Sequence, residues 1–556
     1  MCQSLREKLY CLVCYGLGRP RQEWFRVGER CLPADTDRFF RKKDSNDMEN
    51  PVFRVHTPSE PMMKARKPSP CSIVIFGATG DLAKRKLIPA LYHLTRDQAM
   101  PESFSIIGFS RTVPEATAFR EELLRALSDF SPDPIDPEVW QRFESSIFTM
   151  QGSFTELESF HALKRYMDEL DGTRQTKGNR LFYLATLPTF FPKILKSLKA
   201  AELVHPAGPP DQQPWTRVVI EKPFGHDLSS AIELNRLAAS VLDERQTYRI
   251  DHYMGKETVQ NILVFRFGNS IFEPIWNHKY IDYVEVTMAE NLGVEGRGDF
   301  YDQTGVVRDI IQNHLLEVLT LCAMEPPVSF GADDLRDEKL KILRSLRPVT
   351  IDGLPKHAVF GQYRGYLDEK GVAPASRTPT FAAVKVMIDN WRWQGVPFYM
   401  RAGKRLPTKT TEVVIHFHPI PFCLFGREDV CQMLKPNVLR LRLQPNEGIE
   451  LCFSSKVPGE DLNVADVTMD FSYARAFKKS PPDAYERLLL DAMRGDAMLF
   501  SRRDAVEAAW TFITPILKAW EEELDRGPQE YEPGSEGPLD SMKLLWSDGH
   551  AWRPLA

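Results

Sequence analysis

The sequence lacks three features that mark specialised classes of protein. None of its apolar runs approaches the ~18 residues of a membrane-spanning helix, so no membrane partner is expected. Nine cysteines among 556 residues are too few for a disulfide scaffold. The net charge of −5 gives no basic excess, which argues against a nucleic-acid partner. The content of 43% hydrophobic and 26% charged residues is typical of a folded chain with two large domains or several smaller ones.

The first 70 residues differ in composition from the rest of the chain. They are rich in Arg and Lys, show little periodicity and end in a proline-rich stretch, so we predict an N-terminal extension over 1–70 that is partly disordered. It has neither the apolar core of a secretory signal nor the acid-poor composition of a transit peptide. This favours a cytoplasmic protein and leaves an organellar form as the alternative. Met48 is an alternative start that would remove most of the extension.

Four of the nine cysteines lie in this extension: Cys2, Cys11, Cys14 and Cys31. Cys11 and Cys14 form a CxxC pair, a pattern in which a lowered thiol pKa can create a redox switch. The alternative is a set of ordinary thiols in an unstructured tail. A zinc site is disfavoured because the gaps are irregular and no second CxxC follows. We predict no metal site in the chain.

Strands alternate with helices over residues 71–252. Short apolar runs that end at turns predict buried parallel strands, and the segments between them show helical periodicity. The expected strands are 72–76, 105–109, 180–184 and 216–220, with a helix at about 191–203. This order predicts an α/β domain with a Rossmann-type parallel sheet.

Longer alternating runs appear over residues 253–556. They predict a larger β+α domain with a mixed or antiparallel sheet, which helices cover. The expected strands are 283–288, 381–388, 412–417 and 438–443, and the expected helices are about 305–323, 482–494 and 503–523.

A glycine-rich turn joins the first strand to the first helix, with the sequence Gly77-Ala78-Thr79-Gly80-Asp81-Leu82-Ala83. Glycines here let backbone N–H groups approach a pyrophosphate at a helix N-terminus, and the alternative is a tight turn without a ligand. The second strand is followed by Arg111, where an NAD site requires Asp or Glu. Arg111 would instead meet a 2′-phosphate, which favours NADP; the alternative is a solvated surface arginine.

Polar clusters follow two other predicted strands. Glu221 and Lys222 lie at the carboxyl end of one strand, where ligands bind in open α/β sheets, although the pair could also cap a turn. Residues 249–257 read RIDHYMGKE, and His252 and Lys256 would share a face of a helix. This cluster predicts an anion site, against the alternative of a solvated helix start.

His314 lies on the apolar face of the helix predicted over 305–323. It is either a core histidine with satisfied hydrogen bonds or a general base that a carboxylate orients. The spacing does not identify that carboxylate.

Seven motifs in order resemble the glucose-6-phosphate dehydrogenase family: GATGDLAKRKLIPALYHL, VVIEKPFG, RIDHYMGKE, GVVRDIIQNHLL, PFYMRAGK, LQPNEG and PDAYERLLLD. The resemblance covers residues 71 to 556. It implies oxidation of glucose 6-phosphate to 6-phosphogluconolactone with NADP⁺, the first step of the oxidative pentose phosphate pathway. It also implies a homodimer, formed through the second sheet, or a homotetramer.

Carried over to these positions, the resemblance makes His314 the general base and Asp251 the carboxylate that orients it. The other substrate ligands that it implies are Lys222, His252, Tyr253, Lys256, Glu290, Asp309, Lys404, Lys409 and Gln444. The implied NADP⁺ ligands are Gly77, Ala78, Thr79, Gly80, Asp81, Leu82, Ala83, Lys84, Arg111, Tyr183 and Lys222.

Two departures from the family pattern stand out. Leu187 replaces a proline of the FYLALPP pattern, near the expected nicotinamide. Some members hold a second, structural NADP⁺; Arg401 and Arg442 match that site, but Thr410 replaces a family lysine, so its presence stays open. The alternatives to an active member are another two-domain sugar oxidoreductase and an inactive NADP-binding interaction protein. RIDHYMGKE and RDIIQNHLL together disfavour the first, and the intact Asp251, Lys222 and His314 argue against the second.

Overall fold

The computed structural model describes residues 67–131, 133–209, 212–350, 352–425, 428–478, 482–522 and 527–555. All of them fall within one unit of the chain, Val55–Ala556. Most of the extension predicted over 1–70, including its four cysteines and Met48, lies outside the described residues. The expectations about the redox switch and the start codon therefore stay predictions, as does the division between domains after residue 252.

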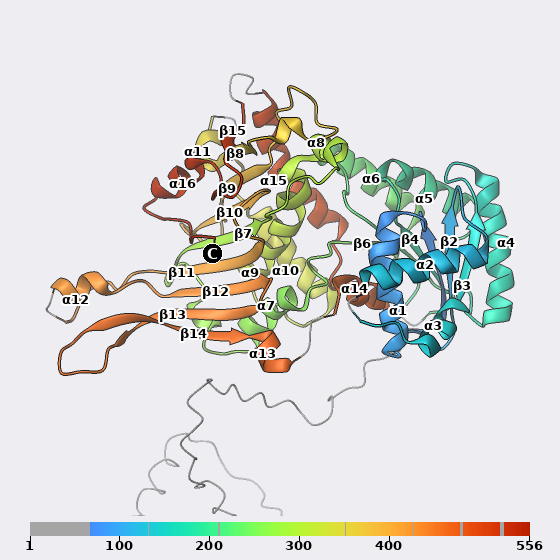
Figure 1. The fold of residues 1–556 in the computed structure, drawn as a ribbon, viewed down its shortest axis with the longest axis horizontal. Helices are drawn as coiled ribbons and strands as arrows, with labels where there is room; N and C mark the ends of the chain where they lie inside the picture. Colours follow the sequence, from blue (N-terminus) through green and yellow to red (C-terminus); the bar gives the residue numbers. More distant parts are fainter. Residues whose placement is uncertain are drawn as a thin grey trace, which may run out of the picture. The chain divides into compact units, whose positions relative to one another are not determined.

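Six parallel strands form the first sheet, in the order β3-β2-β1-β4-β5-β6 (Figure 1). The strand order reverses between β1 and β4, and this reversal opens a ligand crevice beyond their carboxyl ends. The predicted Rossmann-type sheet is confirmed, and the four predicted strands are buried throughout. The strands are β1 Cys71–Phe76, β2 Phe104–Ser110, β3 Ile147–Gln151, β4 Arg180–Leu184, β5 Thr216–Ile220 and β6 Thr247–Arg249; the helices are α1 Ile88–Arg96, α2 Ala116–Phe130, α3 Pro137–Glu144, α4 Leu157–Arg174, α5 Phe191–Ala200 and α6 Leu228–Val241.

The second sheet has nine strands, in the order β14-β13-β12-β11-β7-β10-β9-β8-β15. It is mixed, as predicted, because β10 pairs with β7 and β15 with β8 in parallel, whereas the other pairs are antiparallel. The strands are β7 Ile281–Ala289, β8 Ala358–Tyr363, β9 Phe381–Met387, β10 Pro397–Gly403, β11 Thr410–Phe417, β12 Val438–Gln444, β13 Gly448–Lys456, β14 Val464–Ser472 and β15 Gln529–Tyr531.

A layer of helices covers one face of the second sheet, with α7 against β12 and a π-helical segment against β7 and β10. Helix α15 of this layer also packs on α6 of the first domain, and α14 packs on α1. The helices are α7 Glu257–Phe267, α8 Gly298–Val306, α9 Leu316–Ala323, α10 Ala332–Arg344, α11 Leu354–His357, α12 Glu428–Met433, α13 Tyr473–Phe477, α14 Ala484–Arg494, α15 Arg503–Glu522 and α16 Leu539–Trp546. Within the described ranges, no helix has the length and apolar character to span a membrane.

The single helix predicted over 305–323 is wrong in detail. Gly305 has φ +65° and ends the α-helical backbone of α8, and Val307–Leu315 is a π-helix that leads into α9. A π-helix has i→i+5 hydrogen bonds, so its side chains do not follow the 3.6-residue period used for the prediction. Its register sets the directions of Asp309 and His314.

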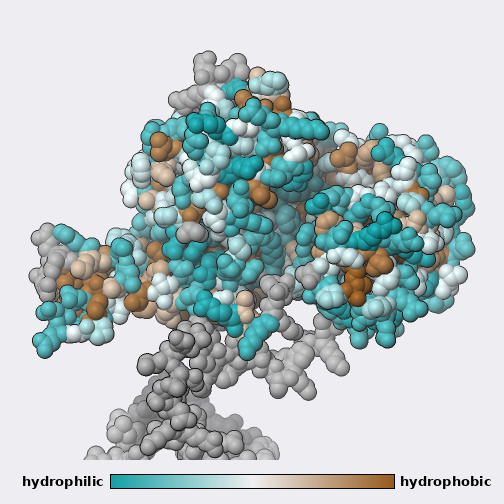
Figure 2. Space-filling view, in the orientation of Figure 1, coloured by the Kyte–Doolittle hydropathy of each residue, from teal (hydrophilic) through white to brown (hydrophobic). Residues whose placement is uncertain are grey.

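The connection between β11 and β12 carries α12 and projects at the left of the view (Figure 1). It exposes large apolar side chains, among them Phe422 at 74% and Leu424 at 83% exposure. Figure 2 shows hydrophobic surface on this projection. A disulfide between Cys423 and Cys431, which the sequence did not predict, closes the loop. An exposed apolar patch of this kind marks an interaction surface.

Candidate active site

The polar clusters meet at the carboxyl ends of β5 and β6. Lys222 follows β5 and Asp251 follows β6, while Asp309 and His314 come from the π-helix between α8 and α9. Side chains from these segments line a cavity of about 300 Å³ together with Glu290 and Lys404. A wider cavity of about 710 Å³ shares several of these residues and extends to Lys256, Lys409 and Gln444. One cleft therefore brings together ten of the predicted catalytic and substrate-binding residues.

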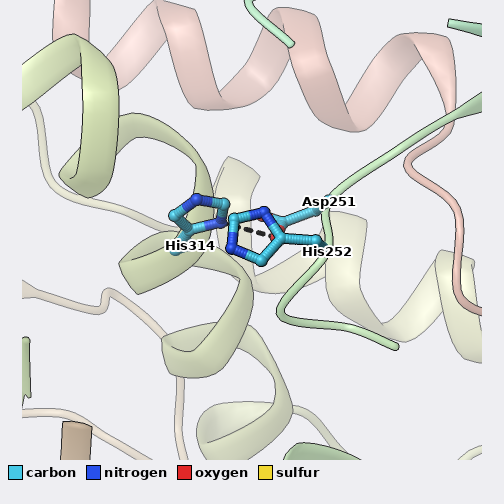
Figure 3. A group of neighbouring side chains, drawn as sticks. All are labelled: Asp251, His252 and His314. Carbon is cyan, nitrogen blue, oxygen red and sulfur yellow. Dashed lines mark hydrogen bonds and ion pairs between the residues drawn. The ribbon is translucent and has the colours of Figure 1, made fainter. Parts of the chain in front are cut away.

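His314 and Asp251 form a buried pair at the floor of the cleft. Nδ1 of His314 lies 2.6 Å from Oδ1 of Asp251, and both side chains are almost fully buried (Figure 3). The turn holds the carboxylate, because Oδ1 also accepts from the backbone N–H of Tyr253 at 2.9 Å. The carboxylate that the sequence did not identify by spacing thus contacts the imidazole directly.

The other imidazole nitrogen faces Lys222. The ammonium Nζ of Lys222 donates to Nε2 of His314 at 2.9 Å and to the carbonyl of Asp309 at 2.8 Å. Burial and the Lys222 charge hold the pKa of His314 well below its ordinary value. His314 is accordingly neutral at pH 7, with its proton on Nδ1 toward Asp251 and a lone pair on Nε2.

His252 stands beside this pair, with its ring centroid 4.5 Å from that of His314 (Figure 3). Ligand atoms of Asp251, His252 and His314 lie within 4.8 Å of one another, close enough for a shared metal ion. However, the Lys222 ammonium already lies at Nε2 of His314, so a cation there would meet a like charge. Burial and then His314 lower the pKa of His252 far below its usual range, so this ring offers a neutral N–H donor.

Tyr253 and Lys256 line the wider cavity. The ammonium of Lys256 lies 3.7 Å from the ring centroid of Tyr253 and donates to Oε1 of Gln444. The prediction that His252 and Lys256 share a helical face is wrong, because residues 252–255 form a turn and Lys256 is the N-cap of α7. Burial and then Lys409 lower the pKa of Lys256 to about 8.

Charges from the second domain close the smaller cavity. Lys404, which follows β10, donates to Oε2 of Glu290 at 2.6 Å, and Glu290 follows β7. Burial opposes ionisation of Asp309, but Lys222 and Lys404 outweigh it and lower its pKa. Carboxylates already paired with ammonium groups can accept hydrogen bonds from hydroxyl groups without carrying an unbalanced charge.

The glycine-rich turn has the shape of a dinucleotide cradle. Gly77 has φ +87°, and a Cβ there would lie 2.4 Å from the carbonyl oxygen of Ala185, so only glycine fits. The turn is closed by the N–H of Gly80, which donates to the carbonyl of Gly77 at 2.9 Å. Thr79 Oγ1 lies 3.1 Å from Ser110 Oγ, at the end of β2.

The predicted cofactor residues fall into two groups. Those of the turn follow β1, and Arg111 follows β2, with its exposed guanidinium 5.9 Å from the Phe190 ring centroid. Lys84 is paired with Glu122 at 2.6 Å. Tyr183 is fully buried in β4 and donates to Glu221 at 2.6 Å, so it supports the strand end that carries Lys222. A direct Tyr183 contact to a cofactor stays a prediction.

Some lining residues were missed by the sequence analysis. Arg297 borders both cavities and Tyr485 borders the wider one, where its ring is stacked 6.3 Å from His252. Tyr485 lies inside the PDAYERLLLD motif, so its position there was the available signal, whereas Arg297 lies outside the seven motifs.

The two arginines that match a second dinucleotide site, Arg401 and Arg442, are already bonded to other residues of the chain. Arg401 is buried, donates to Glu536 at 3.1 Å and to the carbonyl of Arg553 at 2.8 Å, and lies 4.5 Å from the Trp552 ring centroid. Arg442 donates to Asp470. The C-terminal tail thus covers the guanidinium that a second phosphate would need.

A parallel sheet with a glycine-rich turn, joined to a mixed sheet across a cleft with a His–Asp pair, defines a dinucleotide-dependent oxidoreductase. Residues 74–261 match "Glucose-6-phosphate dehydrogenase, NAD binding domain" and residues 263–553 match "Glucose-6-phosphate dehydrogenase, C-terminal domain". The chain therefore belongs to the glucose-6-phosphate dehydrogenase family.

Similar proteins span nearly the same length. The glucose-6-phosphate 1-dehydrogenase of Aggregatibacter actinomycetemcomitans is 45% identical over 87% of this chain and 97% of its own length. That of Chlamydia pneumoniae is 43% identical over 87% of this chain and 96% of its own length. A solved glucose-6-phosphate dehydrogenase in complex with its substrate glucose 6-phosphate has a TM-score of 0.79 and 36% identity, covering 88% of this chain and 100% of its own.

Proposed function

We propose that the chain is a glucose-6-phosphate 1-dehydrogenase, which oxidises D-glucose 6-phosphate to 6-phospho-D-glucono-1,5-lactone with NADP⁺. This is the first step of the oxidative pentose phosphate pathway. The observation that carries the proposal is the buried His314–Asp251 pair, 2.6 Å apart, with Lys222 at the free imidazole nitrogen. The family matches over 74–261 and 263–553 support it.

Nε2 of His314 is the atom that takes the proton from the C1 hydroxyl group. It carries a lone pair, because Nδ1 donates to Asp251. The Lys222 ammonium donates to this lone pair, and the C1 hydroxyl group takes its place there when the sugar binds. Asp251 stabilises the imidazolium that forms. When bound, the nicotinamide supplies the acceptor for the hydride that leaves C1 of the sugar.

The sugar phosphate binds at the wider end of the cleft. Lys256 and Lys409 supply positive charge there, Tyr253 and His252 supply hydroxyl and N–H donors, and all four line that cavity. Glu290 and Asp309 accept hydrogen bonds from the sugar hydroxyl groups, and Lys404 contributes from the second domain. Binding the phosphate away from His314 orients C1 toward the base.

NADP⁺ is favoured over NAD⁺ by the residues after β2. Ser110 ends the strand and Arg111 follows it, where a site for a ribose 2′-hydroxyl would require a carboxylate. Gly77 and Thr79 of the cradle would hold the pyrophosphate, and Arg111 would hold the 2′-phosphate.

The substitution His314→Asn tests the proposal. We expect the variant to keep its fold and its affinity for both substrates and to lose most turnover, followed as NADPH absorbance with glucose 6-phosphate. Wild-type protein that forms no NADPH would instead favour an inactive binding protein. Turnover of other sugars in place of glucose 6-phosphate would favour another sugar oxidoreductase.

A homodimer or homotetramer and a cytoplasmic location complete the proposal. The apolar patch around α12 and the edge strand β14 belong to the second sheet, through which the family resemblance implies dimerisation. Light scattering coupled to size-exclusion chromatography, on wild type and on Leu424→Glu, measures the contribution of this surface. A monomeric wild type would contradict the assembly.

A further inference from the structure

A second cavity lies at the ends of β5 and β6 that point away from the catalytic cleft. It has a volume of about 420 Å³, and its walls include the starts of both strands, the first turn of α10 and the residues that follow α14. Its lining includes the aromatic ring of Trp215 and the charged side chains of Arg217, Arg245, Arg336 and Asp496. Three of these five are arginines, so the cavity has a cationic lining.

Arg217 is buried, with only 7% of it exposed. Its guanidinium lies 3.8 Å from the ring centroid of Trp215, and Nη1 donates to the carbonyls of Ala492 and Met493 at the end of α14. Within the described ranges, Nε and Nη2 have no hydrogen-bond partner and no carboxylate forms an ion pair with this side chain. Two N–H groups of a buried cation are therefore available at the cavity wall.

Gly495 keeps the approach to Arg217 open. It has φ +83° at the C-terminus of α14, and a Cβ there would lie 2.5 Å from Nη2 of Arg217. The left-handed backbone favours glycine at this position, and any larger residue would displace the guanidinium of Arg217.

Arg336 supplies a second buried guanidinium, with 6% exposure. Nη2 donates to Asp333 at 2.6 Å and Nε to the carbonyl of Ala332, which leaves Nη1 without a partner among the described residues. Arg245 is exposed at the rim. Among the described residues of the lining, the carboxylates are Asp333 and Asp496, so three positive charges face two negative ones there.

We propose that this cavity binds a small organic phosphate. Guanidinium N–H groups match phosphate oxygens in geometry and charge. A bound phosphate would compensate the charge of the buried Arg217 and accept from the free Nη1 of Arg336. The volume of about 420 Å³ lies in the usual range for small-molecule sites and leaves room for more than a single phosphate group. Arg217 precedes Lys222 by five residues along β5, so the two sites are roughly 16 Å apart.

The same elements connect this cavity to the catalytic cleft. Strands β5 and β6 begin at the cavity and end at Lys222 and Asp251, and α14 runs between Ala484 at the cleft and Gly495 at the cavity. A ligand in the cavity would therefore contact the segments that position the His314–Asp251 pair.

Calorimetric titration with inorganic pyrophosphate tests the site. Saturating NADP⁺ and the Lys256→Gln background remove competing binding in the cleft, so that one pyrophosphate per chain is expected in the cavity. Arg245→Gln and Arg336→Gln, each in this background, should weaken the binding at least tenfold. Arg125→Gln is the matched control, because this exposed arginine of α2 lies outside the cavity and pairs with Glu121. No binding, or equal binding in all variants, would overturn the proposal.

A second measurement avoids variants that could unfold. A crystal of the wild-type chain soaked in tungstate should show anomalous density beside Arg217 and Arg336, and its absence there would also overturn the proposal. In the calorimetric background, ribose 5-phosphate and AMP then distinguish the ligand's source. Tighter binding of the first identifies a sugar phosphate, and tighter binding of the second identifies a nucleotide.

Discussion

The substitution Asp251→Asn removes the charge that stabilises the imidazolium of His314 while it keeps the shape of the side chain. Oδ1 can still accept from the N–H of Tyr253, so the turn should be retained. At the 2.6 Å separation of Nδ1 and Oδ1 and an effective dielectric constant of about 20, a full unit-charge pair is worth about 6 kcal/mol. The transition state develops only part of that charge, so we expect about 3–5 kcal/mol.

This loss corresponds to a fall in kcat of about 10²- to 10⁴-fold, with KM for glucose 6-phosphate changed less than threefold. NADPH formation under saturating substrates measures it, and thermal unfolding of the variant checks that the fold is intact. A fall in kcat smaller than fivefold in a folded variant would refute the assignment of Asp251 as the partner of the base. A matched rise in KM with constant kcat would place Asp251 in substrate binding instead.

Three further predictions concern the charges around the cleft and the cofactor crevice. Because Lys256 has a pKa of about 8 and is charged only below it, kcat/KM for glucose 6-phosphate should fall as pH rises through about 8. Lys256→Arg should move this alkaline fall to higher pH. A fall at the same pH in the variant would contradict the role of Lys256 in binding the phosphate. Arg111→Asp should lower kcat/KM for NADP⁺ by about 10- to 100-fold and leave that for NAD⁺ within threefold, measured with both cofactors; equal losses would argue against a 2′-phosphate contact. Because Arg401 is already held by Glu536 and the C-terminal tail, equilibrium dialysis should give one NADP⁺ per chain, and two would show that the tail is displaced.

The acid side of the pH profile follows from His314. Its pKa is lowered in the folded protein, so the base is free at any pH above that lowered value, and activity on the acid side should be lost only as pH falls below the ordinary range of histidine. The Lys222 charge contributes to this shift. Lys222→Met should therefore move the acid limb of kcat toward higher pH, besides its effect on rate.

The first sheet could be predicted because four of its strands are buried on both faces. Such strands appear as continuous apolar runs, as in Thr216–Ile220, and the helices between them show a clear period. Strand β3 was missed because most of its side chains are only partly buried, and β6 was missed because it has three residues. Neither strand leaves an apolar run in the sequence.

The sequence indicated which residues belong to the candidate site, but not which of them contact each other. Asp251 and His314 are separated by 63 positions, and no local pattern states that their side chains meet. The pairing of Lys404 with Glu290 joins the ends of two parallel strands, β10 and β7, which are more than a hundred residues apart. Contacts of this kind follow from sheet order, which periodicity does not encode.

The π-helix shows why local rules fail where the chemistry lies. In a regular α-helix, successive side chains are rotated by about 100° around the axis, which fixes the angle between Asp309 and His314. The wider π-helical turn has a smaller rotation per residue, so the angle between these two side chains differs. In the observed register, Nε2 of His314 and the carbonyl and carboxylate of Asp309 all contact the one ammonium of Lys222. The irregular helix is therefore best understood as the element that aligns the base with the strand ends that hold Asp251 and Lys222.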